Sequence, residues 1–205
     1  MKIAIIGTGN VGGALATVWS NKGHEIRLGV RNPNQFKGIE LLKNPNTKAY
    51  TVEEAVKNSE VILLSTPATE AITVTKSLGD TTGKVIIDAM NIVNKQGPLG
   101  FVSTGHAILA NTFTKDVVKC FNTTGANNLA DPNYPTAQLD AFMAGDSQKG
   151  KEIAFSLAKD GGFAECYDIG GNDKFELMEQ FAFFWINLAM FQKLGRNIGF
   201  KLLKR

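Results

Sequence analysis

The chain has 205 residues, and 43% of them are hydrophobic, which is enough for a buried core and excludes extended disorder. With 22 basic and 19 acidic residues the net charge is only +3, and no long basic run marks a surface for nucleic acid or an anionic membrane. No apolar run reaches the roughly 20 residues of a bilayer span, and no signal-peptide pattern is present, so we expect a cytoplasmic protein without membrane segments. Cys120 and Cys166 lie far apart in the sequence without metal-ligating neighbours, which favours small buried side chains over a metal site or a redox dithiol.

Short β-branched runs alternate with helical patterns through the first two thirds of the chain. Strands are expected at residues 2–6, 25–30, 61–65, 85–88 and 117–121, with a weaker one near Ala49, and helices at 11–21, 51–58 and 69–78. Several of these strands are apolar on both faces, which is typical of a parallel sheet covered on both sides. The alternation predicts an α/β fold of the Rossmann type, with a doubly wound, mainly parallel sheet.

The last third begins after Asn122 with a loop or short-helix region rich in turn-forming residues, and further elements follow it. We expect a strand at 141–144, a helix at 149–159, a strand at 164–168 and an amphipathic helix at 174–194, closed by Gly195. Residues 1–205 are interpreted as a single NAD(P)-binding domain. Residues 171–205 form a C-terminal helical extension that packs on this domain or on the partner subunit of a homodimer.

A glycine-rich motif follows the first expected strand directly and opens the first expected helix. Its three glycines meet separate needs: Gly7 makes the tight turn, Gly9 lets the backbone approach a diphosphate, and Gly12 allows close packing of helix and strand. The helix start then offers unpaired N–H groups and a positive dipole end to the diphosphate. The alternative is a glycine turn without a ligand. The expected phosphate-binding residues are Gly7, Thr8, Gly9, Asn10, Val11 and Gly12.

A second signal follows the second expected strand, where a protein that selects NAD places an acidic residue for the ribose 2′-hydroxyl. Arg31 stands there, 19 positions after Gly12, with Asn32 and Lys37 behind it and no carboxylate before Glu40. A guanidinium can hold the 2′-phosphate of NADP with paired hydrogen bonds. Unless Arg31 is merely a solvated surface residue, the sequence predicts NADP(H) as the cofactor, held in part by Arg31, Asn32 and Lys37.

With these residues the chain resembles the NADP oxidoreductases of the coenzyme F420-dependent type, the NADPH:F420 reductases and their bacterial relatives. The reductase domain of the STEAP metalloreductases is more distantly similar. The resemblance extends over nearly the whole chain. The matching segments are residues 7–12, 29–33, 65–67, 88–91, 119–123, 145–146 and 177–188.

The resemblance implies the remaining site residues. It places Ser65, Thr66, Pro67, Ala68 and Asn91 along the nicotinamide half of NADP. It places Asn91, Asn122, Thr123 and Thr124 around a small-molecule redox acceptor, F420 or a flavin, that stacks on the nicotinamide. This chain departs from the F420 reductases at Val30, where they have a hydroxyl residue, at Ala68, where they have a large aromatic, and at Asn122 and Gly125, where they have histidine and proline.

Hydride transfer between stacked rings needs alignment more than acid or base groups, so no catalytic residue and no metal ligand is assigned. His24 is interpreted as structural, and His106 as a surface or helix-start residue with a proton donor as the alternative. Asn91, Asn122, Thr123 and Thr124 could instead be turn residues that satisfy backbone groups. The aromatic cluster of residues 181–191 favours burial in the core or in a dimer over a flavin platform.

Two other functions fit the same N-terminal pattern. One is a reductase of a small carbonyl or imine substrate, which predicts a proton-donating lysine on the C-terminal helix, where Lys174 and Lys193 are available. The other is an NADPH-binding sensor module without turnover.

Overall fold

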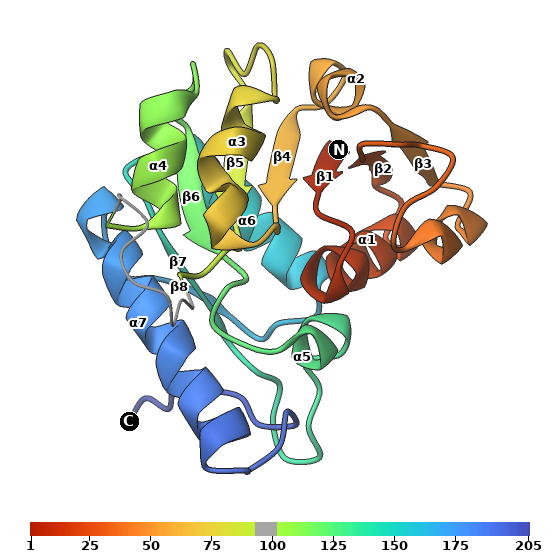
Figure 1. Ribbon diagram of the computed structural model, residues 1–205. Coiled ribbons are helices and arrows are strands. Elements are labelled where there is room, and N and C mark those ends of the chain that lie inside the picture. Colours follow the sequence, from red (N-terminus) through yellow and green to blue (C-terminus); the bar gives the residue numbers. More distant parts are fainter. Residues whose placement is uncertain (93–101) are drawn as a thin grey trace.

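The computed structural model describes residues 1–92 and 102–205, and a single eight-stranded sheet runs through them (Figure 1). Its strands are β1 Lys2–Ile6, β2 Glu25–Gly29, β3 Thr47–Tyr50, β4 Val61–Leu64, β5 Val85–Asp88, β6 Val117–Cys120, β7 Ala141–Ala144 and β8 Cys166–Asp168. The order across the sheet is β3-β2-β1-β4-β5-β6-β7-β8. The strands β1 to β6 are parallel, β7 runs antiparallel to β6, and β8 is parallel to β7. The predicted doubly wound fold of the Rossmann type is confirmed.

Helices cover both faces of the sheet. One face carries α1 Asn10–Asn21, α5 Ala126–Ala130 and α6 Gln148–Asp160. The other carries α2 Val52–Lys57, α3 Ala71–Lys76, α4 Thr104–Asn111 and α7 Phe175–Ile186. Short 3-10 turns lie at Ile39–Lys43, Ala68–Glu70 and Asn172–Lys174, and a π-helical turn at Asn187–Phe191.

The strands are buried on both sides because successive side chains point to opposite faces. In β1, Ile3 and Ile5 join the core on the α1 face, whereas Ala4 and Ile6 join the core on the α2 face. Every residue of β4 and β5 is buried. This double burial explains why these strands are continuous apolar runs rather than alternating ones.

Several helices differ from their predicted ranges. The expected helix at 69–78 begins as a 3-10 turn after Pro67, and the expected helix at 174–194 is regular only from Phe175 to Ile186. No bounds were predicted for α4 or α5, although a helix start was one interpretation of His106 and a short helix was one interpretation of the segment after Asn122. The helix α5 has only five residues in a polar segment, and α4 is set mainly by its cap, since the Ser103 hydroxyl accepts a hydrogen bond from the His106 N–H at 3.2 Å.

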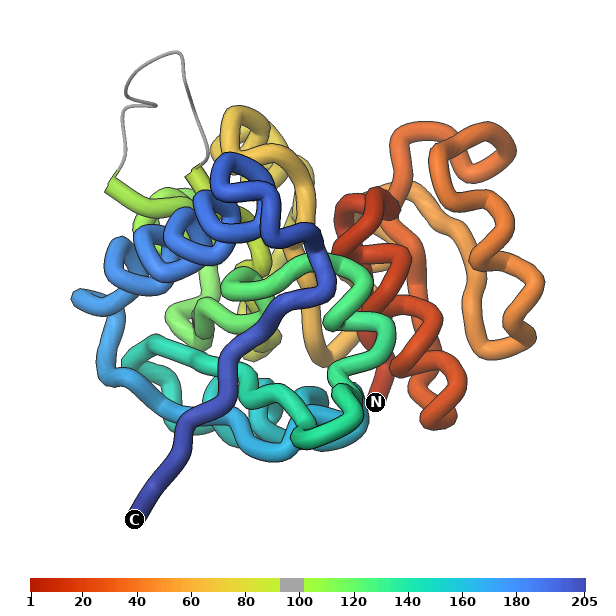
Figure 2. The backbone as a smooth tube through the Cα atoms, turned by 90° about the horizontal axis from the view of Figure 1, so that it is seen from below, coloured from red at the N-terminus to blue at the C-terminus, as the bar shows by residue number. Residues whose placement is uncertain are grey.

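The segment after α7 returns across the carboxyl ends of the strands and passes α5 (Figure 2). The backbone oxygen of Ile198 accepts hydrogen bonds from Trp185 Nε1 at 2.7 Å and from Asn128 Nδ2 at 2.6 Å. Further along, Asp140 accepts from Lys201 Nζ and from the Leu202 N–H. The expected C-terminal helix is therefore a helix followed by an extended segment fastened at the start of β7.

The two cysteines are buried, as expected, but they are neighbours in space. Their Sγ atoms lie 3.8 Å apart, which the separation in the sequence did not predict. Burial, together with the adjacent Cys166, raises the pKa of the Cys120 thiol well above its usual value. Both cysteines are therefore thiols of the core, and Cys120 is a poor nucleophile.

Candidate functional site

The loops that follow β1, β2, β4, β5 and β6 meet at the carboxyl edge of the sheet. From β1 the chain continues to β2 on one side, whereas β4 lies on the other side of β1. The carboxyl end of β1 is therefore a topological switch point. Open α/β sheets bind their ligands at such a point. The residues that the sequence places in the site lie on these loops or in the first turn of the helix that follows.

The glycine loop has the geometry that its three glycines predict. A Cβ on Gly7 would lie 2.7 Å from the Ser65 carbonyl carbon, and a Cβ on Gly12 would lie 1.9 Å from the Gly7 oxygen. Gly9 is different, because a Cβ there would have no atom within 4 Å. The described chain therefore fills the space beside Gly7 and Gly12 and leaves open space above Gly9, as close approach by a diphosphate requires.

The start of α1 is free to receive an anion. Its N-cap is Gly9, which has no side chain to accept from the first N–H groups, and the first turn carries no acidic residue. Unpaired N–H groups and the positive end of the helix dipole together favour a phosphate group. The glycine loop and the start of α1 thus fit the diphosphate of a dinucleotide.

The loop that carries Arg31 is fastened to the glycine loop. The Thr8 hydroxyl donates a hydrogen bond to the backbone oxygen of Lys37. Arg31 itself is exposed, and within the described part of the chain it has no hydrogen bond or ion pair. Lys37 is also exposed, while Asn32 uses its side-chain oxygen to accept from the Asn34 N–H in a local turn. An unpaired guanidinium thus stands beside the predicted phosphate loop, whereas Asn32 is partly occupied as a turn residue.

The loop after β4 packs directly on the glycine loop and on the end of β5. The Ser65 hydroxyl donates to the Gly7 oxygen at 2.8 Å, and the Thr66 hydroxyl lies 3.3 Å from the Met90 sulfur. Pro67 is exposed and Ala68 is buried under it. Ser65 is therefore a positioning residue for the glycine loop, and Thr66 and Pro67 form the surface next to it.

Asn91 and Asn122 form a reciprocal pair. Asn91 Nδ2 donates to the Asn122 backbone oxygen, and Asn122 Nδ2 donates to Asn91 Oδ1, both at 2.8 Å. Asn122 Nδ2 also donates to the Met178 oxygen of α7 at 3.1 Å, which fixes the orientation of this amide. Its Oδ1 is buried and has no partner among the described residues. A buried carbonyl oxygen without a donor is costly and fits a ligand N–H.

The residues on either side of Asn122 explain its placement. Phe121 has a left-handed backbone with φ 62°, which costs roughly 1–3 kcal/mol for a residue with a side chain. Its buried ring packs edge-on against Trp19 with ring centroids 5.4 Å apart. Thr123 is buried, and the Thr124 hydroxyl accepts from Asn128 Nδ2 at 2.8 Å. Of the predicted acceptor residues, Thr124 is therefore hydrogen-bonded to α5, whereas Asn122 has a side-chain oxygen without a partner among the described residues.

Beneath these loops lies a buried ion cluster that the sequence interpretation missed. It consists of Asp88 at the end of β5, Thr104 at the start of α4, Lys119 in β6 and Glu179 in α7. Lys119 Nζ lies 2.7 Å from Asp88 Oδ2 and 2.9 Å from Glu179 Oε1, and both Asp88 and Lys119 are fully buried. Burial raises the pKa of Asp88, although the ammonium of Lys119 opposes that shift. The signal was a lysine inside an otherwise apolar strand, where an unpaired charge would not be tolerated.

The remaining candidate residues lie in other surroundings. His24 contacts Asp160 at 2.9 Å and the N-terminal amine at 3.2 Å, and it precedes β2 at the amino edge of the sheet. His106 lies in the first turn of α4, 2.7 Å from the Ser103 hydroxyl. Lys174 pairs with its neighbour Asp173, and Lys193 is exposed beyond the π-helical turn.

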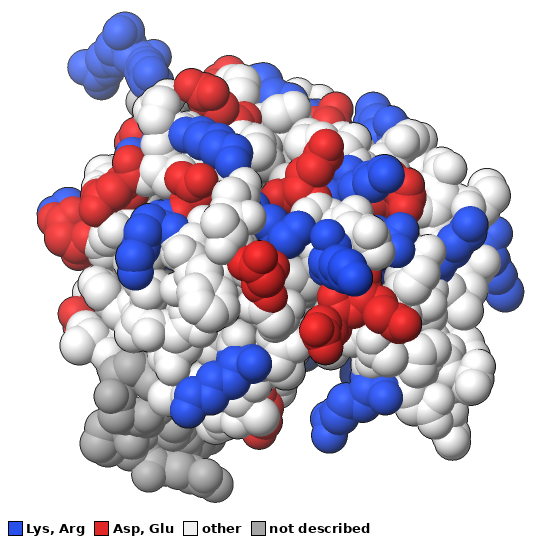
Figure 3. All heavy atoms as spheres, turned by 90° about the horizontal axis from the view of Figure 1, so that it is seen from above, with Lys and Arg blue, Asp and Glu red and all other residues white. Residues whose placement is uncertain are grey.

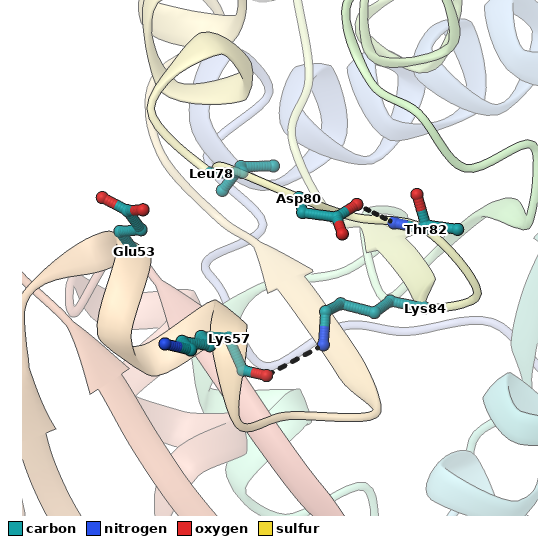
Figure 4. Close-up of a pocket in the computed structure, with 6 residues that line it drawn as sticks. All are labelled: Glu53, Lys57, Leu78, Asp80, Thr82 and Lys84. Carbon is teal, nitrogen blue, oxygen red and sulfur yellow. Dashed lines mark hydrogen bonds between the residues drawn. The ribbon is translucent and has the colours of Figure 1, made fainter.

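A hollow of about 320 Å³ lies at the opposite edge of the sheet, between α2 and the turn before β5 (Figure 4). Its rim mixes both signs of charge, with Glu53, Lys57, Asp80 and Lys84, and Lys84 Nζ already donates to the Lys57 and Ser59 oxygens. The whole face at the amino ends of the strands is similarly mixed in charge (Figure 3). Among the described residues no helix has the length and apolar character needed to cross a bilayer, and no group of acidic, histidine and cysteine side chains is arranged to hold a metal ion.

Comparison with known proteins agrees with this geometry. Residues 2–92 match the family of NADP oxidoreductases, coenzyme F420-dependent. The resemblance inferred from the sequence is confirmed over this segment. It contains the glycine loop, Arg31 and the loop after β4.

Relatives extend the similarity over more of the chain. The metalloreductase STEAP3 of Rattus norvegicus is 28% identical over 165 residues, which cover 79% of this chain and 32% of the relative. A solved structure assigned as an F420-dependent NADP reductase, from Arthrobacter sp. FB24, is 24% identical, covers both chains completely and superposes with a TM-score of 0.86. An imine reductase of Streptomyces aurantiacus is 16% identical, covers 94% of this chain and 62% of its own, and has a TM-score of 0.66. The chain spans about a third of the length of the curated relatives it matches.

Proposed function

We propose that the chain is an NADP(H)-dependent oxidoreductase that transfers hydride between NADP(H) and a planar acceptor, F420, a flavin or a similar ring. The observation that carries this proposal is the arrangement of two positive features at one edge of the sheet. One is the start of α1, beside the open space above Gly9. The other is Arg31, which has no hydrogen bond or ion pair among the described residues and lies on the loop that Thr8 fastens to the glycine loop. The match of residues 2–92 to NADP oxidoreductases supports the same cofactor.

In this proposal the residues divide along the dinucleotide. Residues 7–12 receive the diphosphate through backbone N–H groups, and Arg31, with Lys37 and Asn32 nearby, receives the 2′-phosphate. The loop of residues 65–68 and Asn91 line the nicotinamide half. The buried Oδ1 of Asn122 suits the carboxamide N–H of nicotinamide or a ring N–H of the acceptor.

The chain contributes alignment rather than proton chemistry. When bound, NADPH supplies the hydride, and the acceptor ring receives it together with its electron pair. The reciprocal amides of Asn91 and Asn122 hold two loops in register, and Ser65 holds the β4 loop on the glycine loop. Such positioning shortens the distance between two stacked rings and removes the entropic cost of their encounter.

A homodimer and a cytoplasmic location belong to the same proposal. The outer side of α7 and the following turn exposes Leu177, Phe183, Phe184 and Met190 to between 47% and 51%, which suits a second copy of the chain. Cys120 and Cys166 are free thiols, which suits a reducing compartment.

The test is oxidation of NADPH, followed at the nicotinamide absorbance band, with F420, FMN, FAD, a ferric chelate and simple ketones and imines offered in turn. We expect turnover with at least one of the planar ring acceptors. Tight binding of NADPH without oxidation by any acceptor would instead indicate a sensor module.

A reductase of small imines or carbonyls is the second candidate, because solved imine reductases share the fold. That chemistry needs a proton donor at the substrate nitrogen or oxygen. Lys174 pairs with Asp173 and Lys193 is exposed, so neither supports this candidate. Turnover with an imine and none with planar rings would favour it.

A further inference from the structure

The buried cluster beneath the site has one more negative than positive group. Backbone N–H groups donate hydrogen bonds to both carboxyl groups, and the Lys119 ammonium contacts both. Asp88 accepts from the Met90 N–H at 2.9 Å and from Lys119 Nζ at 2.7 Å. Glu179 accepts from the N–H groups of Thr104 and Ile92, each at 2.9 Å. These donors favour the ionised form of both carboxyl groups and oppose the rise that burial causes in the pKa of Asp88. With both carboxyl groups ionised, the single ammonium of Lys119 leaves one negative charge in excess.

This charge lies directly under the loops assigned to the nicotinamide half. Lys119 Nζ donates to the Met90 oxygen at 2.9 Å, while the Met90 sulfur meets the Thr66 hydroxyl. Ile92, whose N–H is held by Glu179, follows Asn91. The cluster is shielded from water, with Glu179 only 7% exposed, so solvent screens its field weakly.

We propose that Asp88 and Glu179 favour the oxidised, positively charged nicotinamide over the reduced, neutral one, and so make bound NADPH a stronger hydride donor. The inference rests on the proposed function, because it needs the nicotinamide at this edge of the sheet. When hydride leaves C4 of the reduced ring with both electrons, the ring gains one positive charge and the planar acceptor gains the hydride. An excess negative charge nearby lowers the energy of that product.

The expected size follows from Coulomb interaction. If the nicotinamide lies roughly 10–15 Å from the cluster, a unit charge at an effective dielectric constant of about 20 changes the equilibrium by about 5- to 20-fold. Neither carboxylate touches the proposed ligand, so both act as positioning and electrostatic residues rather than catalytic ones. A merely structural cluster would hold four elements together without distinguishing NADP⁺ from NADPH.

The test is the ratio of dissociation constants, Kd for NADP⁺ divided by Kd for NADPH, measured by calorimetry on the full chain. Glu179→Gln and Asp88→Asn each remove one negative charge with little change in shape. Thr104→Val removes a hydroxyl that lies 2.6 Å from Asp88 Oδ2 and 3.0 Å from Glu179 Oε1, and it leaves the charge unchanged. Circular dichroism shows which variants fold, and either carboxyl variant alone is sufficient for the test.

We expect the ratio to rise about 5- to 20-fold in each carboxyl variant, and to stay within about twofold of the wild-type value in Thr104→Val. An unchanged ratio in a folded carboxyl variant, or an equal rise in Thr104→Val, would overturn the inference. Failure of the wild-type chain to bind either form of the dinucleotide would instead overturn the proposed function.

Discussion

Gly9 and Gly12 belong to one short motif but meet opposite surroundings. The site of a Cβ on Gly12 is filled by the chain itself, 1.9 Å from the Gly7 oxygen, whereas the site above Gly9 is open. One glycine is therefore required by the fold and the other by the ligand that we propose. Alanine at each position adds one methyl group, so the substitution at Gly12 should lower stability and the substitution at Gly9 should weaken binding.

We expect Gly12→Ala to lower the free energy of unfolding by about 1–3 kcal/mol, because the methyl group must displace backbone. Gly9→Ala should cost less than about 1 kcal/mol, since its φ of −76° suits alanine, and should weaken NADPH binding about tenfold or more by filling the diphosphate space. Urea unfolding and calorimetry measure the two effects. Equal loss of stability in both variants, with unchanged binding to Gly9→Ala, would contradict this division.

The individual site residues that could be predicted are those whose role follows from their spacing relative to a neighbouring strand. The glycine loop and Arg31 follow directly after strands, so their positions were readable from the sequence. The partners of Lys119 lie 31 and 60 positions away, and the reciprocal pair of Asn91 and Asn122 spans 31 positions. No local pattern connects such residues, because the parallel register of β5 and β6 brings Asp88 beside Lys119 and the packing of α7 adds Glu179.

Among the elements, the strands and α6 were predicted best, and α4, α5 and α7 least well. The strands are short runs buried on both faces, which leave a clear apolar signature. The helix α4 is defined by the Ser103 cap more than by periodicity, and α5 is a single turn or little more. The buried ion cluster joins four elements, β5, β6, α4 and α7, and adds to the apolar packing of α7 against the sheet.

Lys119→Met should therefore destabilise the protein strongly. Removal of one partner leaves two buried carboxylates uncompensated, and we expect a loss of about 3–5 kcal/mol in the free energy of unfolding. Lys149→Met is the matched control: it removes a lysine that is 53% exposed in its pair with Asp116, and it should cost less than about 1 kcal/mol. Urea unfolding of both variants makes the comparison. A similar small loss in both would show that the cluster does not join these elements.

All eight strands of the molecule share one sheet, and the C-terminal segment returns to Asp140, just before β7. We propose on these grounds that residues 1–205 form a single domain, with α7 packed on its own sheet through Phe175 and Met178. The opposite, largely apolar side of α7 is exposed, with Glu176 and Gln180 beside Phe183 and Phe184. The return of the chain after α7 was not predicted, because it depends on hydrogen bonds to distant side chains.

If that apolar side joins two copies, Phe183→Glu should convert a dimer to a monomer. Burying a charge in the interface costs more than the contact of one ring contributes. Phe113→Glu is the control, because Phe113 is 74% exposed and lies after α4 rather than on α7. Light scattering after size-exclusion chromatography gives the mass of each. A wild-type mass equal to that of one chain would contradict the dimer.

Arg31 is the residue that we propose to recognise the ribose 2′-phosphate of NADP(H). The direct measurement is calorimetric titration of NADPH and of NADH into the wild-type chain, into Arg31→Asp, and into Arg205→Asp, which reverses an exposed charge at the chain end. We expect the wild type and Arg205→Asp to prefer NADPH. In Arg31→Asp the affinity for NADPH should fall about 100-fold, as loss of a charge-assisted, two-point contact implies, and the affinity for NADH should change by less than about threefold. Equal losses for both dinucleotides, or no preference for NADPH in the wild type, would contradict the claim.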